Sequence, residues 1–119
     1  MNEPRELERL VLSLLPAVLR DELEFEPTFP GVAFAVLYRD PSGSSAAVLR
    51  YEPGASVPPH RHVGYEHVYV LQGSQRDERG EYPAGTLVIN PPGSEHSVES
   101  PSGCLVVVIW QQPVAFLER

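Results

Sequence analysis

The sequence contains a single cysteine, Cys104, and no lysine among its 119 residues. One cysteine excludes an internal disulfide and is compatible with a reducing compartment. No apolar run approaches the ~20 residues that a membrane-spanning helix needs. The first residues mix glutamate with arginine, whereas a signal peptide needs a positive leader. We therefore expect a cytoplasmic protein that is not inserted in a membrane.

Positive charge is also scarce. Nine arginines face sixteen acidic residues, which gives a net charge of −7. A nucleic-acid partner is excluded on this ground, because binding phosphates requires a basic surface. The length suits one hydrophobic core, and a hydrophobic content of 42% is typical of a globular domain.

The N-terminal part of the chain has a helical pattern. Over residues 3–23, apolar side chains recur at the spacing of one helix face, and Asn2 is suited to cap the first turn. Pro16 lies inside the pattern and should kink the helix or split it in two. We expect an N-terminal helical segment over residues 1–25 and a single domain over residues 26–119. The apolar stripe fits two roles, covering the rest of the fold or pairing two copies of the chain.

From residue 31 onward the pattern changes to short segments rich in Val, Ile, Leu and Tyr, separated by turns containing Pro and Gly. Thirteen prolines and nine glycines supply these turns. Regularly spaced short strands favour an all-β sandwich or barrel over alternating strands and helices. The expected strands are Val32–Arg39, Ser45–Tyr51, Glu66–Leu71, Thr86–Ile89 and Leu105–Gln111.

Four polar residues in the second half of the chain form a candidate metal site: His60, His62, Glu66 and His96. Three imidazoles and one carboxylate are a donor set that suits a divalent transition metal. His60 and His62 are two residues apart, so both rings leave the same face of an extended strand. Glu66 has an alternative role, because a carboxylate beside a metal can instead accept a hydrogen bond from a ligand.

The segments around these residues resemble the two conserved motifs of the cupin superfamily. The first motif, G-x5-H-x-H-x3-E-x6-G, is matched at Gly54, His60, His62, Glu66 and Gly73. The second, G-x5-P-x-G-x2-H-x3-N, is matched at Gly85, Pro91, Gly93 and His96, with Ser100 in place of the final Asn. The resemblance implies a cupin jelly-roll barrel, also called a double-stranded β-helix, with a metal held by these histidines and Glu66.

Within the cupins, the sequence between the motifs is similar to the ChrR-type, or anti-sigma-factor cupin-like, family. The similar runs include Val70-Leu-Gln-Gly73, Asp77-Glu78, Asn90-Pro-Pro-Gly-Ser94 and Gly103-Cys104. The resemblance implies a sensor domain that binds a metal and has room for a small ligand. In the anti-sigma factor, a helical domain with its own His/Cys zinc site precedes the cupin. No such motif is found here, so either this chain is a free-standing cupin or its partner-binding function has been lost, and we expect no sigma-factor partner.

The metal decides between two functions. Four ligands complete a tetrahedral zinc site, which would be closed and would suit a sensor. The same four ligands on octahedral iron, manganese or nickel leave two positions free, which would suit a small non-haem dioxygenase acting on a diketone-like or enol substrate. A metal-dependent isomerase or lyase is a third hypothesis, without a distinguishing residue. Whether the protein is an enzyme is open from the sequence. From the habits of cupins, which cover exposed strand edges, we expect a homodimer.

Other conspicuous residues have simpler interpretations. His67 follows Glu66 directly and should face away from the metal. Cys104 is expected to be a buried core thiol, with an oxidisable thiol near the metal as the alternative. Tyr38, Tyr69 and Trp110 are expected in the core rather than along a cavity.

Overall fold

A computed structural model describes residues 9–117 and shows one short helix and ten strands, all paired antiparallel. The elements are α1 (Pro16–Glu22), β1 (Glu26–Phe29), β2 (Val32–Arg39), β3 (Ser45–Tyr51), β4 (Ala55–Arg61), β5 (Glu66–Asp77), β6 (Gly80–Pro83), β7 (Leu87–Asn90), β8 (Glu95–Ser100), β9 (Cys104–Trp110) and β10 (Ala115–Phe116).

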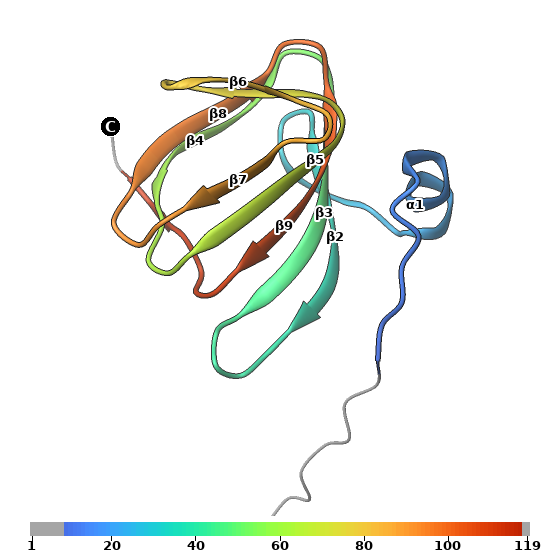
Figure 1. The fold of residues 1–119 in the computed structure, drawn as a ribbon, viewed down its shortest axis with the longest axis horizontal. Coiled ribbons are helices and arrows are strands. Elements are labelled where there is room, and N and C mark those ends of the chain that lie inside the picture. The colour runs from blue at the N-terminus through green and yellow to red at the C-terminus, as the bar shows by residue number, and fades with distance from the viewer. Residues whose placement is uncertain (1–8, 118–119) are drawn as a thin grey trace, which may run out of the picture.

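The strands curl into an open barrel with two walls (Figure 1). One wall contains β1, β2, β3, β9, the first half of β5 and β7. The other wall contains β10, β4, β8, β6 and the second half of β5. Strand β5 is twelve residues long and passes from one wall to the other. It therefore connects the two halves of the barrel covalently.

The change of wall along β5 occurs at Gly73. This residue has a φ of 75°, in the left-handed region that favours glycine. A Cβ at this position would collide with the carbonyl oxygen of Gly103 and lie 2.9 Å from the Cα of Cys104. The glycine of the first sequence motif is thus required by the close approach of β5 to the start of β9.

Alternation along the strands separates the barrel interior from its outer faces. In β5, Glu66, Val68 and Val70 are buried, and the side chains between them are more exposed. The interior is built mainly from small and β-branched residues: Val32, Ala55, Val57, Val68, Val70, Val98, Val106 and Val108. Such side chains suit packed strands but leave space at the centre of the curled sheet.

Helix α1 covers part of the outer face of the β3–β9 wall. Its buried residue Leu19 contacts Val48 and Leu105, and Leu23, Leu71 and Val107 pack around them. The predicted helix over residues 3–23 is confirmed over Pro16–Glu22 and wrong over residues 9–15, which are neither helix nor strand. The helix begins at Pro16, which is tolerated in the first turn but excludes the residue before it from helical geometry. Residues 3–8 of the prediction lie outside the described part of the chain.

The predicted all-β fold is confirmed, and the five predicted strands are present as β2, β3, β5, β7 and β9 with small shifts at their ends. β5 extends six residues further than predicted, to Asp77. The other strands were not predicted from the pattern. Within residues 9–117, no helix is long and apolar enough to span a membrane.

Candidate metal centre

Three histidines meet inside the barrel. His60 lies on β4 and His96 on β8, and the two residues are directly paired across these antiparallel strands. Their Nε2 atoms are 3.1 Å apart. His62 follows the end of β4, and its ring centroid lies 5.2 Å from that of His60 and 4.7 Å from that of His96. One nitrogen from each ring can be chosen so that all three lie within 4.8 Å of one another. All three side chains are buried, at 1–5% exposure.

Hydrogen bonds fix the orientation of two of the rings through backbone carbonyls. The Nδ1 of His60 lies 2.8 Å from the carbonyl oxygen of Pro58. The Nδ1 of His62 lies 3.1 Å from the carbonyl oxygen of Ser94 and 2.9 Å from its hydroxyl. A carbonyl oxygen only accepts hydrogen bonds, so each Nδ1 must carry the proton. In the neutral rings, both Nε2 atoms therefore present a lone pair.

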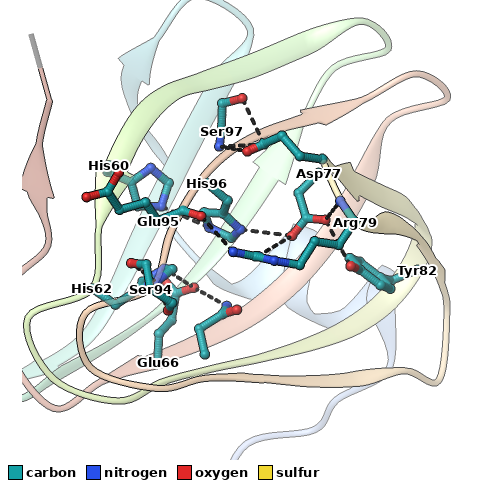
Figure 2. Close-up of polar contacts among 12 residues, drawn as sticks. His60, His62, Glu66, Asp77, Arg79, Tyr82, Ser94, Glu95, His96 and Ser97 are labelled. Atoms are coloured by element: carbon teal, nitrogen blue, oxygen red, sulfur yellow. Dashed lines mark hydrogen bonds and ion pairs between the residues drawn. The ribbon is translucent and has the colours of Figure 1, made fainter. Parts of the chain in front are cut away.

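His96 is oriented by a carboxylate. Its Nδ1 donates to Asp77 Oδ2 at 3.0 Å, and both side chains are 3% exposed. Asp77 also accepts from the backbone N–H of Arg79 and the hydroxyl of Tyr82, each at 2.9 Å. Figure 2 shows His96 between His60 and Asp77, with Tyr82 on the far side of the carboxylate and the Arg79 side chain extending past it to the carbonyl oxygen of Glu95. Burial would raise the pKa of Asp77, but the hydrogen bonds from His96, Arg79 and Tyr82 outweigh it and lower that pKa. An ionised Asp77 thus fixes the Nδ1–H tautomer of His96.

Two lone pairs that face each other at 3.1 Å, as those of His60 and His96 do, need a cation between them or beside them. The pKa of His60 is lowered, first by burial and then by the neighbouring histidines, against the effect of the Pro58 carbonyl. Protonation of this ring is therefore unfavourable. A metal ion is therefore better suited than a proton to bind the lone pairs of the three Nε2 atoms.

Glu66 reaches the cluster from the first residue of β5. Its Oε1 lies 3.1 Å from the Nε2 of His62. The same oxygen accepts from the side-chain amide of Asn90 at 3.0 Å, and Oε2 accepts from the indole of Trp110 at 2.7 Å. Burial opposes ionisation of Glu66, but the three histidines prevail and its pKa is lowered. The carboxylate is thus negatively charged and held at the edge of the histidine cluster.

The positions of the donor atoms suit a metal ion. The Nε2 of His62 is buried and makes no hydrogen bond within the described residues, although Glu66 Oε1 is near it. An unsatisfied buried nitrogen is costly, and a metal would satisfy it. The separations of 3.1 Å between donor atoms are close to those of two ligands of one ion, which at about 2.1 Å from the ion lie roughly 3.0 to 3.4 Å apart for octahedral to tetrahedral angles. The three histidines form the group of donors that would hold the ion, and Glu66 lies beside it, next to His62.

The second sequence motif holds His62 in place through a turn. Gly93 donates its N–H to the carbonyl oxygen of His62 at 2.7 Å, and His62 donates its N–H to that of Ser94 at 2.9 Å. The hydroxyl of Ser94 donates to Pro91 at 2.6 Å. The turn between β7 and β8 is thus hydrogen-bonded to the loop after β4. This explains why Pro91 and Gly93 accompany His96 in the motif.

A cavity of about 270 Å³ adjoins the cluster. His60, Glu66 and His96 line one part of it, and most of the remaining wall is apolar, including Val68 and Val108. Its volume is close to the lower end of small-molecule sites, about 300–1,000 Å³. The cavity can therefore bring a small apolar molecule to the histidines.

The sequence reasoning did not identify several residues of the site. Asp77, Asn90 and Ser94 were noted only as parts of the ChrR-type sequence, without a role. Trp110 was expected in the core, but it lines the cavity and binds Glu66. The hydrogen-bond donors and acceptors around a metal site have no fixed spacing from its ligands, so no pattern in the sequence marks them.

The remaining expectations have mixed outcomes. His67 faces the outer surface beside Tyr65, as predicted for the residue after Glu66. Cys104 is a buried core thiol, 4% exposed. The prediction for Tyr38 and Tyr69 is wrong, because both lie on outer faces, 42% and 37% exposed.

Curled antiparallel walls, a histidine cluster on β4 and β8 and an adjoining cavity define a cupin. The matched family is the ChrR cupin-like domain, over residues 17–115, and the chain belongs to this family. The anti-sigma-E factor ChrR of Cereibacter sphaeroides is 37% identical over 90 residues, which cover 72% of this chain and 41% of that protein. The chain therefore matches less than half the length of this curated relative.

Two solved structures have similar folds. The Rhodobacter sphaeroides complex of SigE with the anti-sigma ChrR matches with a TM-score of 0.70 and 26% identity, covering 92% of this chain and 70% of that chain. An acetylacetone dioxygenase from Acinetobacter johnsonii matches with a TM-score of 0.80 and 18% identity, covering 99% of this chain and 83% of that chain. The second likeness shows the fold alone.

Proposed function

We propose that this protein is a metal-binding cupin of the sensor type, with a divalent ion held by His60, His62, Glu66 and His96. The main support is the orientation of the three histidine rings. Each ring is fixed by a hydrogen bond from its Nδ1 to Pro58, Ser94 or Asp77, which leaves its Nε2 free to bind a metal. A bound metal would supply a positive centre that attracts an oxygen or nitrogen atom of a small ligand. The chain's own residues orient the rings, exclude water and shape the adjoining cavity.

Membership in the ChrR cupin-like family supports the sensor function over an unrelated enzyme activity. Zinc is the metal that this proposal favours: the three histidines would bind it, and the fourth tetrahedral position would go to Glu66 or, when a small ligand is present, to the oxygen of that ligand. The test is metal analysis of the gently purified protein by mass spectrometry, followed by titration of the metal-free protein with zinc. We expect one zinc per chain and loss of binding in His62→Ala, whereas His67→Ala, with its ring on the outer surface, should bind normally. A protein that takes up no metal would overturn the proposal.

A second candidate function is a small dioxygenase that uses iron at the same residues. The apolar cavity beside His60, Glu66 and His96 favours it, because it can present a substrate to the metal. The fold shared with an acetylacetone dioxygenase makes β-diketones the first substrates to try. Oxygen uptake by the iron-loaded protein above that of His62→Ala would support an enzyme. Equal uptake by both proteins would count against it.

The homodimer is also proposed here. Apolar side chains on the outer face of the β5–β9–β7 wall are 37–55% exposed: Tyr69, Leu87, Ile89 and Ile109. Burial of such a patch between two copies would be favourable. Light scattering should give twice the mass of the chain, and Ile109→Glu should shift the population toward monomer. An unchanged monomer at all concentrations would contradict the proposal. The cytoplasmic location and the lack of a sigma-factor partner stay predictions.

A further inference from the structure

The cavity beside the histidine cluster has a second polar wall, formed by Tyr51 and Gln75. Tyr51 is the last residue of β3, and Gln75 lies in the second half of β5. Both residues are 5% exposed, and both line the same cavity as His60, Glu66 and His96. Two polar side chains in a barrel interior otherwise built from valine and alanine need an explanation, because burial of polar groups is costly.

The strand register separates Tyr51 from Glu66 along β9, whereas Gln75 lies two residues from Asp77, the partner of His96. Tyr51 is paired with Cys104, the first residue of β9, and Glu66 is paired with Trp110, the last. Six residues of an extended strand, about 20 Å of backbone, separate these positions, but both side chains point into the barrel, and burial and the charge of Glu66 contribute to the raised pKa of Tyr51. The cavity wall between them is apolar, with Leu49, Val68 and Val108. A ligand that filled the cavity would therefore meet polar groups at both ends and apolar groups in the middle.

The second polar wall retains capacity to bind a ligand. The Tyr51 hydroxyl interacts with the Gln75 side chain, and burial raises the pKa of Tyr51, so the hydroxyl keeps its proton. A hydroxyl offers one donor and two lone pairs, and a carboxamide offers two donors and an acceptor oxygen. One mutual hydrogen bond uses only part of this capacity. The pair can thus both donate to and accept from one uncharged polar group.

We propose that the cavity binds a small elongated molecule with two polar ends. One end is an oxygen function that lies at the histidine cluster, and this part of the inference rests on the proposed metal site. The other end is an uncharged hydroxyl or carbonyl that hydrogen-bonds to Tyr51 and Gln75. The middle is apolar. A charged distal group is excluded from this class, because Tyr51 and Gln75 carry no charge to pair with it.

The test uses two probes with the same metal-chelating head. One is ω-hydroxyhexanohydroxamic acid, and the other is heptanohydroxamic acid, which carries a methyl group in place of the distal hydroxyl. Their affinities for the zinc-loaded full chain are measured by calorimetry, so that the contribution of the head cancels in the ratio. We expect the hydroxyl probe to bind as tightly as the methyl probe or up to about tenfold tighter, owing to its hydrogen bonds. In an apolar pocket, the methyl probe would instead bind at least about fivefold tighter.

Variants separate the polar pair from other effects. Tyr51→Phe and Gln75→Leu, made singly and together, should reverse the preference toward the methyl probe. Tyr38→Phe, on the outer face of β2, is the matched control and should leave the ratio unchanged. The two single variants approach the same question independently, so a folding defect in one leaves the other as a test. Circular dichroism and zinc content verify each variant before titration.

The outcomes distinguish this inference from the proposed function. A chain that binds no zinc defeats the proposed metal site itself. A zinc-loaded chain that binds neither probe, or that prefers the methyl probe, overturns the two-ended ligand and leaves the metal site intact. A preference for the hydroxyl probe that persists in both single variants also overturns it, because another group would then bind the distal hydroxyl.

Discussion

Replacing Asp77 by asparagine should weaken metal binding without removing any proposed ligand. The carboxylate accepts the Nδ1–H of His96 at 3.0 Å, and neither side chain is more than 3% exposed. Hydrogen bonds to a charged group contribute about 1.5–3 kcal/mol. At about 1.4 kcal/mol for each factor of ten, this is a loss of roughly 10- to 100-fold in metal affinity, the range found for partners of metal-binding histidines.

The assay is competition for zinc between the protein and a chelator of known affinity, at constant pH. Glu78→Gln is the matched control, because Glu78 neighbours Asp77 but accepts from the backbone N–H and hydroxyl of Ser97 rather than from His96. The control should bind zinc within about twofold of the wild type, since its loss affects an exposed bond. Asp77→Glu, which keeps the charge but displaces it, should lie between the two.

Equal affinity of Asp77→Asn and the wild type would refute the reasoning. It would mean that Pro58 and Ser94, which orient the other two rings, suffice to build the site, and that the tautomer of His96 adjusts without cost. A Glu78→Gln defect as large as that of Asp77→Asn would also refute it, because the effect would then come from general loss of negative charge.

Other predictions concern stability and reactivity. Gly73→Ala should lower the free energy of unfolding by more than about 2 kcal/mol in denaturant titrations, because the added Cβ would collide with Gly103. Gly85→Ala is the control: a Cβ there meets open space, so the substitution should lower the free energy of unfolding by only about 1–2 kcal/mol. Cys104, whose pKa burial raises to about 11, should resist thiol reagents at pH 8 until the protein unfolds; rapid labelling of the folded chain would contradict this. The folded pKa of Asp77 lies below its ordinary value of 3.8, so its stabilisation is present above that pH and is lost as pH falls through the folded pKa. In acid titrations, Asp77→Asn should therefore show a smaller loss of stability than the wild type.

No proline or glycine interrupts the strands that the sequence predicted. Val32–Arg39 and Ser45–Tyr51 match β2 and β3 residue for residue. β4 was missed because Pro58 and Pro59 lie within it, and prolines normally end a strand. The pairing of β4 with β8 is irregular between Val57 and His60, so the two prolines occupy a bulge where no ladder hydrogen bond is required.

The helix prediction failed over residues 9–15 for a different reason. Leu10, Leu14 and Leu15 have the spacing of a helix face, but they are 47–65% exposed and belong to neither hydrophobic cluster of the described residues. The spacing of apolar residues shows which side chains a helix could bury, but not whether a surface is there to cover them. In this structure the helix is present only around Leu19, which packs against the β3–β9 wall. The same limit applies to the site. The histidines could be recognised by their spacing, whereas Asp77 and Trp110 become partners only through the pairing of distant strands.

Strand β5 begins at Glu66 and ends at Asp77, so a single continuous element carries both carboxylates that touch the histidines. Neither carboxylate can be displaced along the strand axis without pulling on the other, and the register of β5 against β9 and β8 sets both positions at once. An insertion or deletion within this strand would therefore displace one carboxylate relative to the other and disrupt the histidine cluster, although no histidine had been altered.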